Sequence, residues 1–114
     1  MTKSSIMSDL MSVIIDRKKD PRAGTSYVTS LLAGGVPRIG EKVIEEAAEV
    51  VAAGHEPGDP GREHLVKEVA DLVFHAMVLL GYRDLHWDDV EAELGRRSGI
   101  SGIAEKAARK SRGE

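Results

Sequence analysis

The sequence predicts a single all-α domain. Apolar residues recur at intervals of three and four along nearly the whole chain, and no stretch alternates apolar and polar residues over the length of a strand. With 114 residues, of which 41% are hydrophobic and 4% aromatic, the chain has room for one small core built from aliphatic side chains. We therefore expect residues 1–114 to form one helical bundle domain of about five to six helices.

The first two predicted helices occupy the N-terminal third of the chain. The first covers about residues 5–19 and ends before the Asp20-Pro21 pair, because the residue before a proline disfavours helical backbone. The second is short. It begins at Thr25 or Ser26 as the capping residue and stops at Gly34-Gly35, a pair typical of a helix C-terminus.

Two longer helices follow and form the centre of the predicted fold. Pro37 suits the first turn of a third helix, which runs to Gly54. Pro60 opens a fourth helix, the longest, which closes near Gly81. The connecting turn, residues 55–59, is so short that the two helices must be antiparallel neighbours.

The C-terminal part of the chain predicts two shorter helices. Asp88, followed three residues later by Glu91, resembles a capping box and predicts a fifth helix over residues 89–97. A last helical segment is expected over residues 101–110.

The third and fourth helices are apolar on more than one face, so both sides of each helix need cover. One small domain has too few other residues to bury both sides of these two helices. We expect a homodimer in which the second chain covers these faces, giving a dimeric four-helix-bundle core.

The composition excludes several classes of function. Without cysteine, the chain has no disulfide scaffold, thiolate zinc site, iron–sulfur cluster or cysteine nucleophile. No apolar run approaches the roughly 20 residues that cross a bilayer, and the first ten residues lack a secretory core, which predicts a cytoplasmic protein without a membrane partner. The basic ends lack interleaved aromatic residues, so nucleic acid is not expected as a partner.

Acidic residues concentrate in the middle of the chain. Residues 41–93 carry fourteen Asp and Glu against four Lys and Arg, whereas residues 94–114 carry two against six. Solvated helix faces would explain this asymmetry. The alternative is a set of carboxylates that hold cations while the basic ends meet phosphate, as nucleotide chemistry requires.

Five of these acidic residues fall on the third and fourth helices at helical spacing. Glu45, Glu46 and Glu49 share one side of the third helix, and Glu68 and Asp71 repeat the three-residue spacing on the fourth. Measured from the connecting turn at about 1.5 Å per residue, the two sets overlap in height. The carboxylates are interleaved with valine and alanine in the most apolar part of the chain, unlike an ordinary exposed acidic face.

Clustered carboxylates repel one another unless a proton, a basic side chain or a metal compensates them. Lys42 and Lys67 are the basic residues nearest to these carboxylates along the two helices, so the cluster is under-compensated. Oxygen ligands favour a hard cation, and Mg²⁺ that keeps water and binds substrate phosphate fits better than a closed calcium cage. The four histidines show no spacing that indicates joint ligation, although His75 follows Asp71 by four residues and could orient its carboxylate.

At these residues the chain resembles the all-α nucleoside triphosphate pyrophosphohydrolases, the MazG-like superfamily, whose signature is Glu-x-x-Glu, a variable gap and Glu-x-x-Asp. Within that superfamily it is similar to the phosphoribosyl-ATP pyrophosphohydrolase family of histidine biosynthesis. The matching segments span nearly the whole chain: residues 13–18, 24–27, 42–50, 68–75, 96–102 and 105–106. Two residues depart from the family pattern, Ile44 in place of glycine and Phe74 in place of tyrosine, and neither is at a ligand position.

The resemblance implies Mg²⁺-dependent hydrolysis of phosphoribosyl-ATP to phosphoribosyl-AMP and pyrophosphate. It implies that the metal ligands are Glu46, Glu49, Glu68 and Asp71. A water molecule near one of these carboxylates is then the nucleophile, and Glu45 is either a further ligand or a base. Lys42 lies one turn before Glu46, where it meets a phosphate oxygen or the leaving pyrophosphate, or else pairs with Glu45 or Glu46.

Basic residues outside the acidic stretch are candidates for the ribose phosphate and the triphosphate, since guanidinium and ammonium groups suit phosphate. They are Arg17, Lys18, Arg97, Lys106 and Arg109. Two alternative functions remain open at this stage. One is hydrolysis of other nucleoside or deoxynucleoside triphosphates, and the other is a helical interaction module without catalysis.

Overall fold

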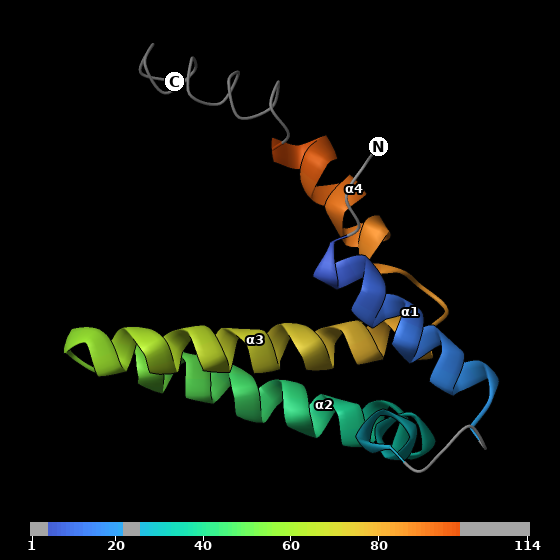
Figure 1. The fold of residues 1–114 in the computed structure, drawn as a ribbon, viewed down its shortest axis with the longest axis horizontal. Coiled ribbons are helices and arrows are strands. Elements are labelled where there is room, and N and C mark those ends of the chain that lie inside the picture. Colours follow the sequence, from blue (N-terminus) through green and yellow to red (C-terminus); the bar gives the residue numbers. More distant parts are fainter. Residues whose placement is uncertain (1–4, 22–25, 99–114) are drawn as a thin grey trace.

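The computed structural model describes residues 5–21 and 26–98 and contains only helices there. Figure 1 shows the four helices, which are α1 (Ile6–Lys19), α2 (Tyr27–Gly54), α3 (Gly58–Tyr82) and α4 (Trp87–Ser98). The all-α prediction is confirmed, but the described part of the chain has four helices rather than five or six. The helix expected at residues 101–110 lies outside the described residues.

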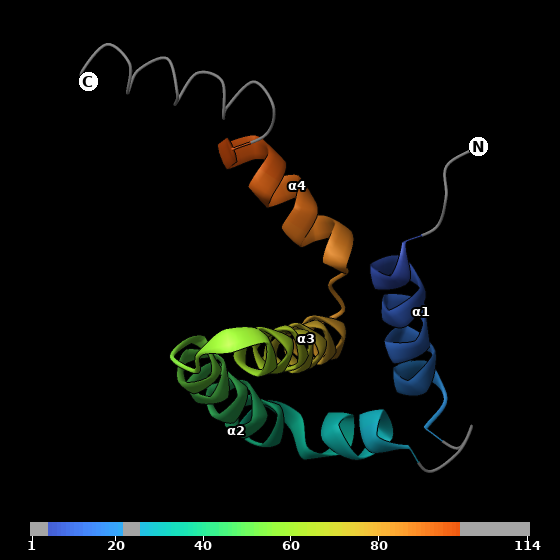
Figure 2. The ribbon, with the colours of Figure 1, turned by 60° about the vertical axis from the view of Figure 1, so that its left-hand side comes forward.

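The second and third predicted helices are joined in α2. The expected stop at Gly34-Gly35 is a kink, where Gly35 has φ 67° and ψ −163° while helical backbone resumes at once. Only glycine adopts this conformation readily. Pro37 follows two residues later, at a position that favours the start of a helix, so no loop separates the two segments, and Figure 2 shows the change of direction.

Helices α2 and α3 form a long antiparallel hairpin, as expected from the short turn, and they lie side by side in Figure 1. The turn is tight because Gly61, near the start of α3, lies under the carbonyl group of Glu56, where a Cβ atom would be 2.3 Å from that oxygen. The antiparallel arrangement is what brings the acidic segments of the two helices to the same height.

The core lies where α1 packs across the C-terminal half of α3 and the first half of α2. Met11 and Ile14 of α1 are fully buried there. Gly81 permits this close crossing, since a Cβ atom at Gly81 would be 2.6 Å from the Cγ2 atom of Ile14. The other buried apolar residues of the core cluster are Val28, Leu31, Ile39, Met77 and Val78.

Hydroxyl side chains cap the two N-terminal helices. The Oγ atom of Ser5 accepts a hydrogen bond from the backbone N–H of Ser8, and that of Ser26 accepts one from Thr29, each at 3.1 Å. Both caps agree with the predicted helix starts to within a residue. Across the described ranges, no helix combines the length and apolar character needed to cross a bilayer.

Candidate active site

The hairpin brings three of the four predicted metal ligands together. Glu46 of α2 and Glu68 and Asp71 of α3 each offer a carboxylate oxygen, and the three atoms lie within 4.8 Å of one another. Glu46 and Glu68 are half-buried, whereas Asp71 is exposed. This arrangement agrees with the overlap in height that the spacing predicted.

The fourth predicted ligand, Glu49, belongs to a neighbouring group. Ligand atoms of Glu49, His64 and Glu68 also lie within 4.8 Å of one another, so Glu68 is common to both groups. His64 was not among the site residues predicted from the sequence. A signal was nevertheless present, because His64 and Glu68 are four residues apart and therefore share one face of α3.

His64 is held between two carboxylates. Its Nδ1 atom is 2.9 Å from both carboxylate oxygens of Glu56, and its Nε2 atom is 3.1 Å from Oε1 of Glu68. The hydrogen bond to Glu56 raises the pKa of His64 above its ordinary value, and Glu68 adds to this, against partial desolvation. Glu56 lies in the turn before α3. The imidazole ring of His64 therefore links this turn to Glu68.

Burial and the neighbouring carboxylates raise the pKa of Glu46. Desolvation, a hydrogen bond shared with Glu68 and the charges of Asp71, Glu68 and Glu49 all raise the pKa of Glu46 above 4.5. Two carboxylates at hydrogen-bonding distance require a proton or a cation between them. The oxygen donors of Glu46, Glu68 and Asp71 therefore fit a hard divalent cation such as Mg²⁺.

Lys42 and Glu45 lie beside this cluster and pair with each other. The Nζ atom of Lys42 is 3.2 Å from Oε2 of Glu45, an intrahelical ion pair of α2. Among the described residues, Glu45 belongs to neither of the two groups of three potential metal ligands. Both residues line a surface pocket with Arg38 and Glu41, one turn from Glu46.

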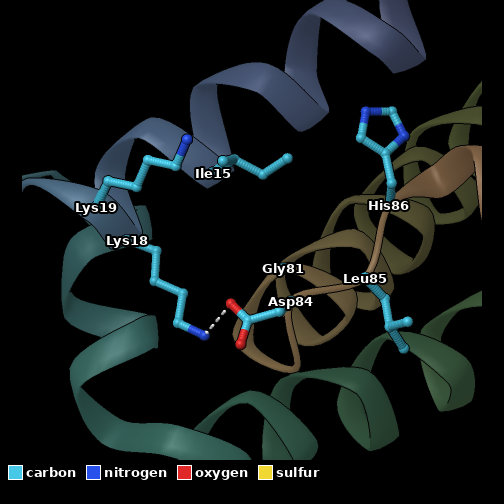
Figure 3. A pocket seen from close by; sticks show the side chains of 7 residues that line it. All are labelled: Ile15, Lys18, Lys19, Gly81, Asp84, Leu85 and His86. Atoms are coloured by element: carbon cyan, nitrogen blue, oxygen red, sulfur yellow. Dashed lines mark hydrogen bonds and ion pairs between the residues drawn. The ribbon is translucent and has the colours of Figure 1, made fainter.

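Lys18 lies elsewhere, at the end of α1. Its Nζ atom donates hydrogen bonds to the carbonyl oxygen of Tyr82 at 2.6 Å and to Oδ1 of Asp84 at 2.7 Å. Figure 3 shows Lys18 and Asp84 on the wall of a cavity of about 250 Å³ that Lys19 and His86 also line. Asp71 and Tyr82 are separated by roughly 16 Å along α3, so within one chain Lys18 is remote from the carboxylates. Its hydrogen bond to Tyr82 instead connects α1 to the end of α3.

The remaining predicted phosphate-binding residues are also apart from the carboxylates. Arg17 lines a small cavity between α1 and the start of α2, together with Pro21 and Thr29. Arg97 is exposed on α4, where its Nε atom is 3.2 Å from Oε2 of Glu93. Lys106 and Arg109 lie outside the described residues.

His75 is a buried structural histidine with two partners. Its Nδ1 atom donates to the backbone carbonyl oxygen of Asp71 at 2.8 Å, so the ring does not orient the Asp71 carboxylate. In the neutral ring, Nε2 accepts a hydrogen bond from the hydroxyl of Tyr27, also at 2.8 Å. Tyr27 stacks on Phe74 with ring centroids 6.2 Å apart, which ties the start of α2 to the segment of α3 that carries Asp71.

The chain is similar in sequence to known proteins of one family. Residues 7–98 match the family model for phosphoribosyl-ATP pyrophosphohydrolase. A phosphoribosyl-ATP pyrophosphatase of Neisseria gonorrhoeae is 53% identical over 106 residues, covering 92% of this chain and 94% of that protein. Its counterpart in Geotalea daltonii is 47% identical over 104 residues, covering 91% and 94%. The one in Rhodopirellula baltica is 42% identical over 109 residues, covering 96% and 91%.

The family match spans all four helices, and the carboxylates of α2 and α3 lie well inside it. The similarity to each of these relatives also extends over more than nine-tenths of the chain. The chain therefore belongs to the phosphoribosyl-ATP pyrophosphohydrolase family.

Proposed function

We propose that this chain hydrolyses phosphoribosyl-ATP to phosphoribosyl-AMP and pyrophosphate, the second step of histidine biosynthesis, in the cytoplasm. Relatives at 42% to 53% identity are phosphoribosyl-ATP pyrophosphatases. The observation that carries the proposal is the convergence of Glu46, Glu68 and Asp71 from two antiparallel helices. Phosphoryl transfer depends mainly on positioning and charge neutralisation, which such a site supplies when it holds a divalent cation.

In this proposal, Glu46, Glu68 and Asp71 hold Mg²⁺, and Glu49 extends the same acidic surface. The bound cation would neutralise phosphate charge and lower the pKa of a coordinated water molecule. The carboxylates of the chain orient that water and accept its proton. The raised pKa of Glu46 supports this view, because burial and then the neighbouring carboxylates disfavour the charge of this group when no cation is bound.

Lys42 and Glu45 are proposed to act on the substrate side of the site. In the structure they neutralise each other at 3.2 Å. The pair is on the surface and costs little to open, since exposed ion pairs contribute at most about 1 kcal/mol. A substrate phosphate can therefore replace Glu45 as the ion-pair partner of the Lys42 ammonium group. The carboxylate of Glu45 is then free to act near the attacking water as a further ligand or base.

We also propose that the chain forms a homodimer. The hairpin leaves large apolar side chains in solvent at Ile44, Val51 and Val66, which are 72%, 63% and 70% exposed. These residues lie next to the carboxylates along the chain. A second copy that covers them would complete a four-helix core around the active site.

The test of the proposed function is release of pyrophosphate from phosphoribosyl-ATP with Mg²⁺, measured beside dUTP, dCTP and ITP at equal concentration. We expect phosphoribosyl-ATP to be hydrolysed preferentially, and Asp71→Asn to lose the activity while keeping its helical circular dichroism. Preference for a deoxynucleotide would contradict the assignment of substrate. Absence of pyrophosphate release from every nucleotide would instead favour a helical interaction module.

A further inference from the structure

Arg38 is an unpaired cation on the face of α2 that carries Glu46. It is exposed, and no hydrogen bond or ion pair joins it to another described residue. Arg38, Lys42 and Glu46 are spaced four residues apart, so they follow one another along this face. At about 1.5 Å per residue, Arg38 lies roughly 12 Å from Glu46 along the helix axis, with Lys42 between them. Two cations therefore lead away from the carboxylates along α2.

The side chain of Arg38 packs closely against the backbone at the kink of α2. A Cβ atom at Gly34 would be 2.5, 2.9 and 3.2 Å from the Cβ, Cγ and Cδ atoms of Arg38. Only glycine leaves room for the aliphatic part of Arg38 at this distance. The contact limits the directions in which the guanidinium group extends, and a side chain that is already restricted loses less conformational entropy when it binds a ligand.

Arg38 and Lys42 line one surface pocket of about 410 Å³. Its acidic residues leave the guanidinium group free, since Glu45 pairs with Lys42 at 3.2 Å and Glu41 forms no ion pair with Arg38. A guanidinium group binds a phosphate through two parallel N–H···O hydrogen bonds. The exposed pair of Lys42 and Glu45 costs little to open, so the pocket offers two cations to one phosphate group.

We propose that Arg38 binds a phosphate group of the substrate that the metal ion does not contact, which rests on the proposed hydrolysis of phosphoribosyl-ATP. This substrate carries a triphosphate at one end and a ribose 5-phosphate at the other. An ion between α2 and α3 neutralises the phosphates that it contacts, so the remaining phosphate charge requires cations at a distance. Hydrolysis separates the two ends, because one leaves as pyrophosphate and the other remains in phosphoribosyl-AMP.

The experiment measures the dissociation constants of both products, inorganic pyrophosphate and phosphoribosyl-AMP, for the full chain with Mg²⁺ by isothermal titration calorimetry. Arg38→Gln should weaken the binding of one product about 10-fold to 100-fold and lower kcat/KM for phosphoribosyl-ATP by a similar factor. Weaker binding of pyrophosphate assigns Arg38 to the triphosphate end. Weaker binding of phosphoribosyl-AMP assigns it to the ribose phosphate and makes it a residue that determines specificity.

Two further variants test the chemistry of the contact. Arg38→Lys keeps the charge but not the paired donors, so it should weaken the same product by less than Arg38→Gln does. Arg62→Gln is the matched control, because Arg62 is an exposed arginine of α3 that does not line the pocket. It should bind both products as the unaltered chain does.

The binding measurement does not depend on turnover, so the two proposals can fail separately. Unchanged dissociation constants and unchanged kcat/KM in Arg38→Gln would overturn the role of Arg38 and leave the proposed function standing. If the unaltered chain prefers a deoxynucleotide, the proposed substrate is wrong. Weaker pyrophosphate binding by Arg38→Gln would then still assign Arg38 to the triphosphate.

Discussion

The carboxylates of the candidate active site are costly to ionise together because they are close to one another and partly buried. Glu46 is the clearest case, since its pKa is raised by desolvation first and then by Glu68, Asp71 and Glu49. A native carboxyl group with a raised pKa destabilises the metal-free fold at neutral pH, because it must ionise against its surroundings.

Replacing Glu46 by glutamine should separate stability from activity. The neutral amide removes the repulsion and still donates a hydrogen bond to Glu68, so the melting temperature of the metal-free chain should rise. Pyrophosphate release should fall roughly 100-fold or more, because a metal ligand is lost. Glu91→Gln, at an exposed glutamate of α4, is the control and should leave both quantities unchanged. Activity retained by Glu46→Gln would contradict the ligand role.

The pKa shifts also predict how stability depends on pH in the absence of metal. Since the pKa of His64 is raised above 6.5, its stabilising contribution is complete below that pH and is lost as pH rises through the native pKa. The raised pKa of Glu46 has the same sign, with its penalty appearing as pH rises above 4.5. Urea unfolding with chelator should show lower stability at about pH 8 than at about pH 6. The opposite trend would contradict these assignments.

The carboxylates could be predicted because helical spacing alone places Glu46, Glu68 and Asp71 on facing sides of a hairpin. The partners of the histidines could not be predicted in the same way. His75 bonds to Tyr27, which is 48 residues away in the sequence, and the contact exists only because of the packing of α2 on α3. His64 also depends on Glu56, whose position is fixed by the turn between the helices.

At the scale of elements, the least regular feature is the kink of α2. The Gly34-Gly35 pair and Pro37 were interpreted correctly as an interruption, but a helix end and a kink have the same local signals. What distinguishes them is the packing of the segment before Gly35, where Val28 and Leu31 are buried in the core. That tertiary contact cannot be derived from the pattern of one helix.

The two glycines of α2 at 35 and 40 allow a matched test of the kink. Gly35→Ala should destabilise the fold by about 1–3 kcal/mol, because φ 67° with ψ −163° is accessible essentially to glycine alone. A Cβ atom there would also lie 3.2 Å from the hydroxyl oxygen of Tyr82. Gly40→Ala, with nothing within 4 Å of its Cβ, should stabilise by about 0.5–1 kcal/mol. Equal effects in urea unfolding would contradict the kink.

In the whole molecule, a single chain leaves a large apolar surface exposed to solvent, and burial against another molecule would stabilise it. Besides the exposed residues of the hairpin, an apolar groove of about 490 Å³ lies between α3 and α4, and Leu79, Trp87 and Val90 are among its lining residues. The sequence predicted this excess from helices that are apolar on more than one face. Which molecule buries this surface cannot be derived from the apolar pattern of a single chain, because that pattern shows only that the surface is apolar.

Light scattering should give a mass of twice 12.3 kDa for the unaltered chain. Val66→Glu places a charge in the exposed apolar stripe of α3, so it should shift the protein to monomer and reduce activity along with dimer content. Leu94→Glu is the control, because Leu94 is exposed on α4, outside the hairpin, and this variant should remain dimeric. A monomeric unaltered chain at micromolar concentration would contradict the homodimer.

The most direct test of the account is a crystal structure of the chain with Mg²⁺ and a nonhydrolysable analogue of phosphoribosyl-ATP. We expect an ion about 2.1 Å from carboxylate oxygens of Glu46, Glu68 and Asp71, with a phosphate oxygen of the analogue in the same coordination shell. An analogue bound with its phosphates on basic residues alone, and with no ion between α2 and α3, would contradict it.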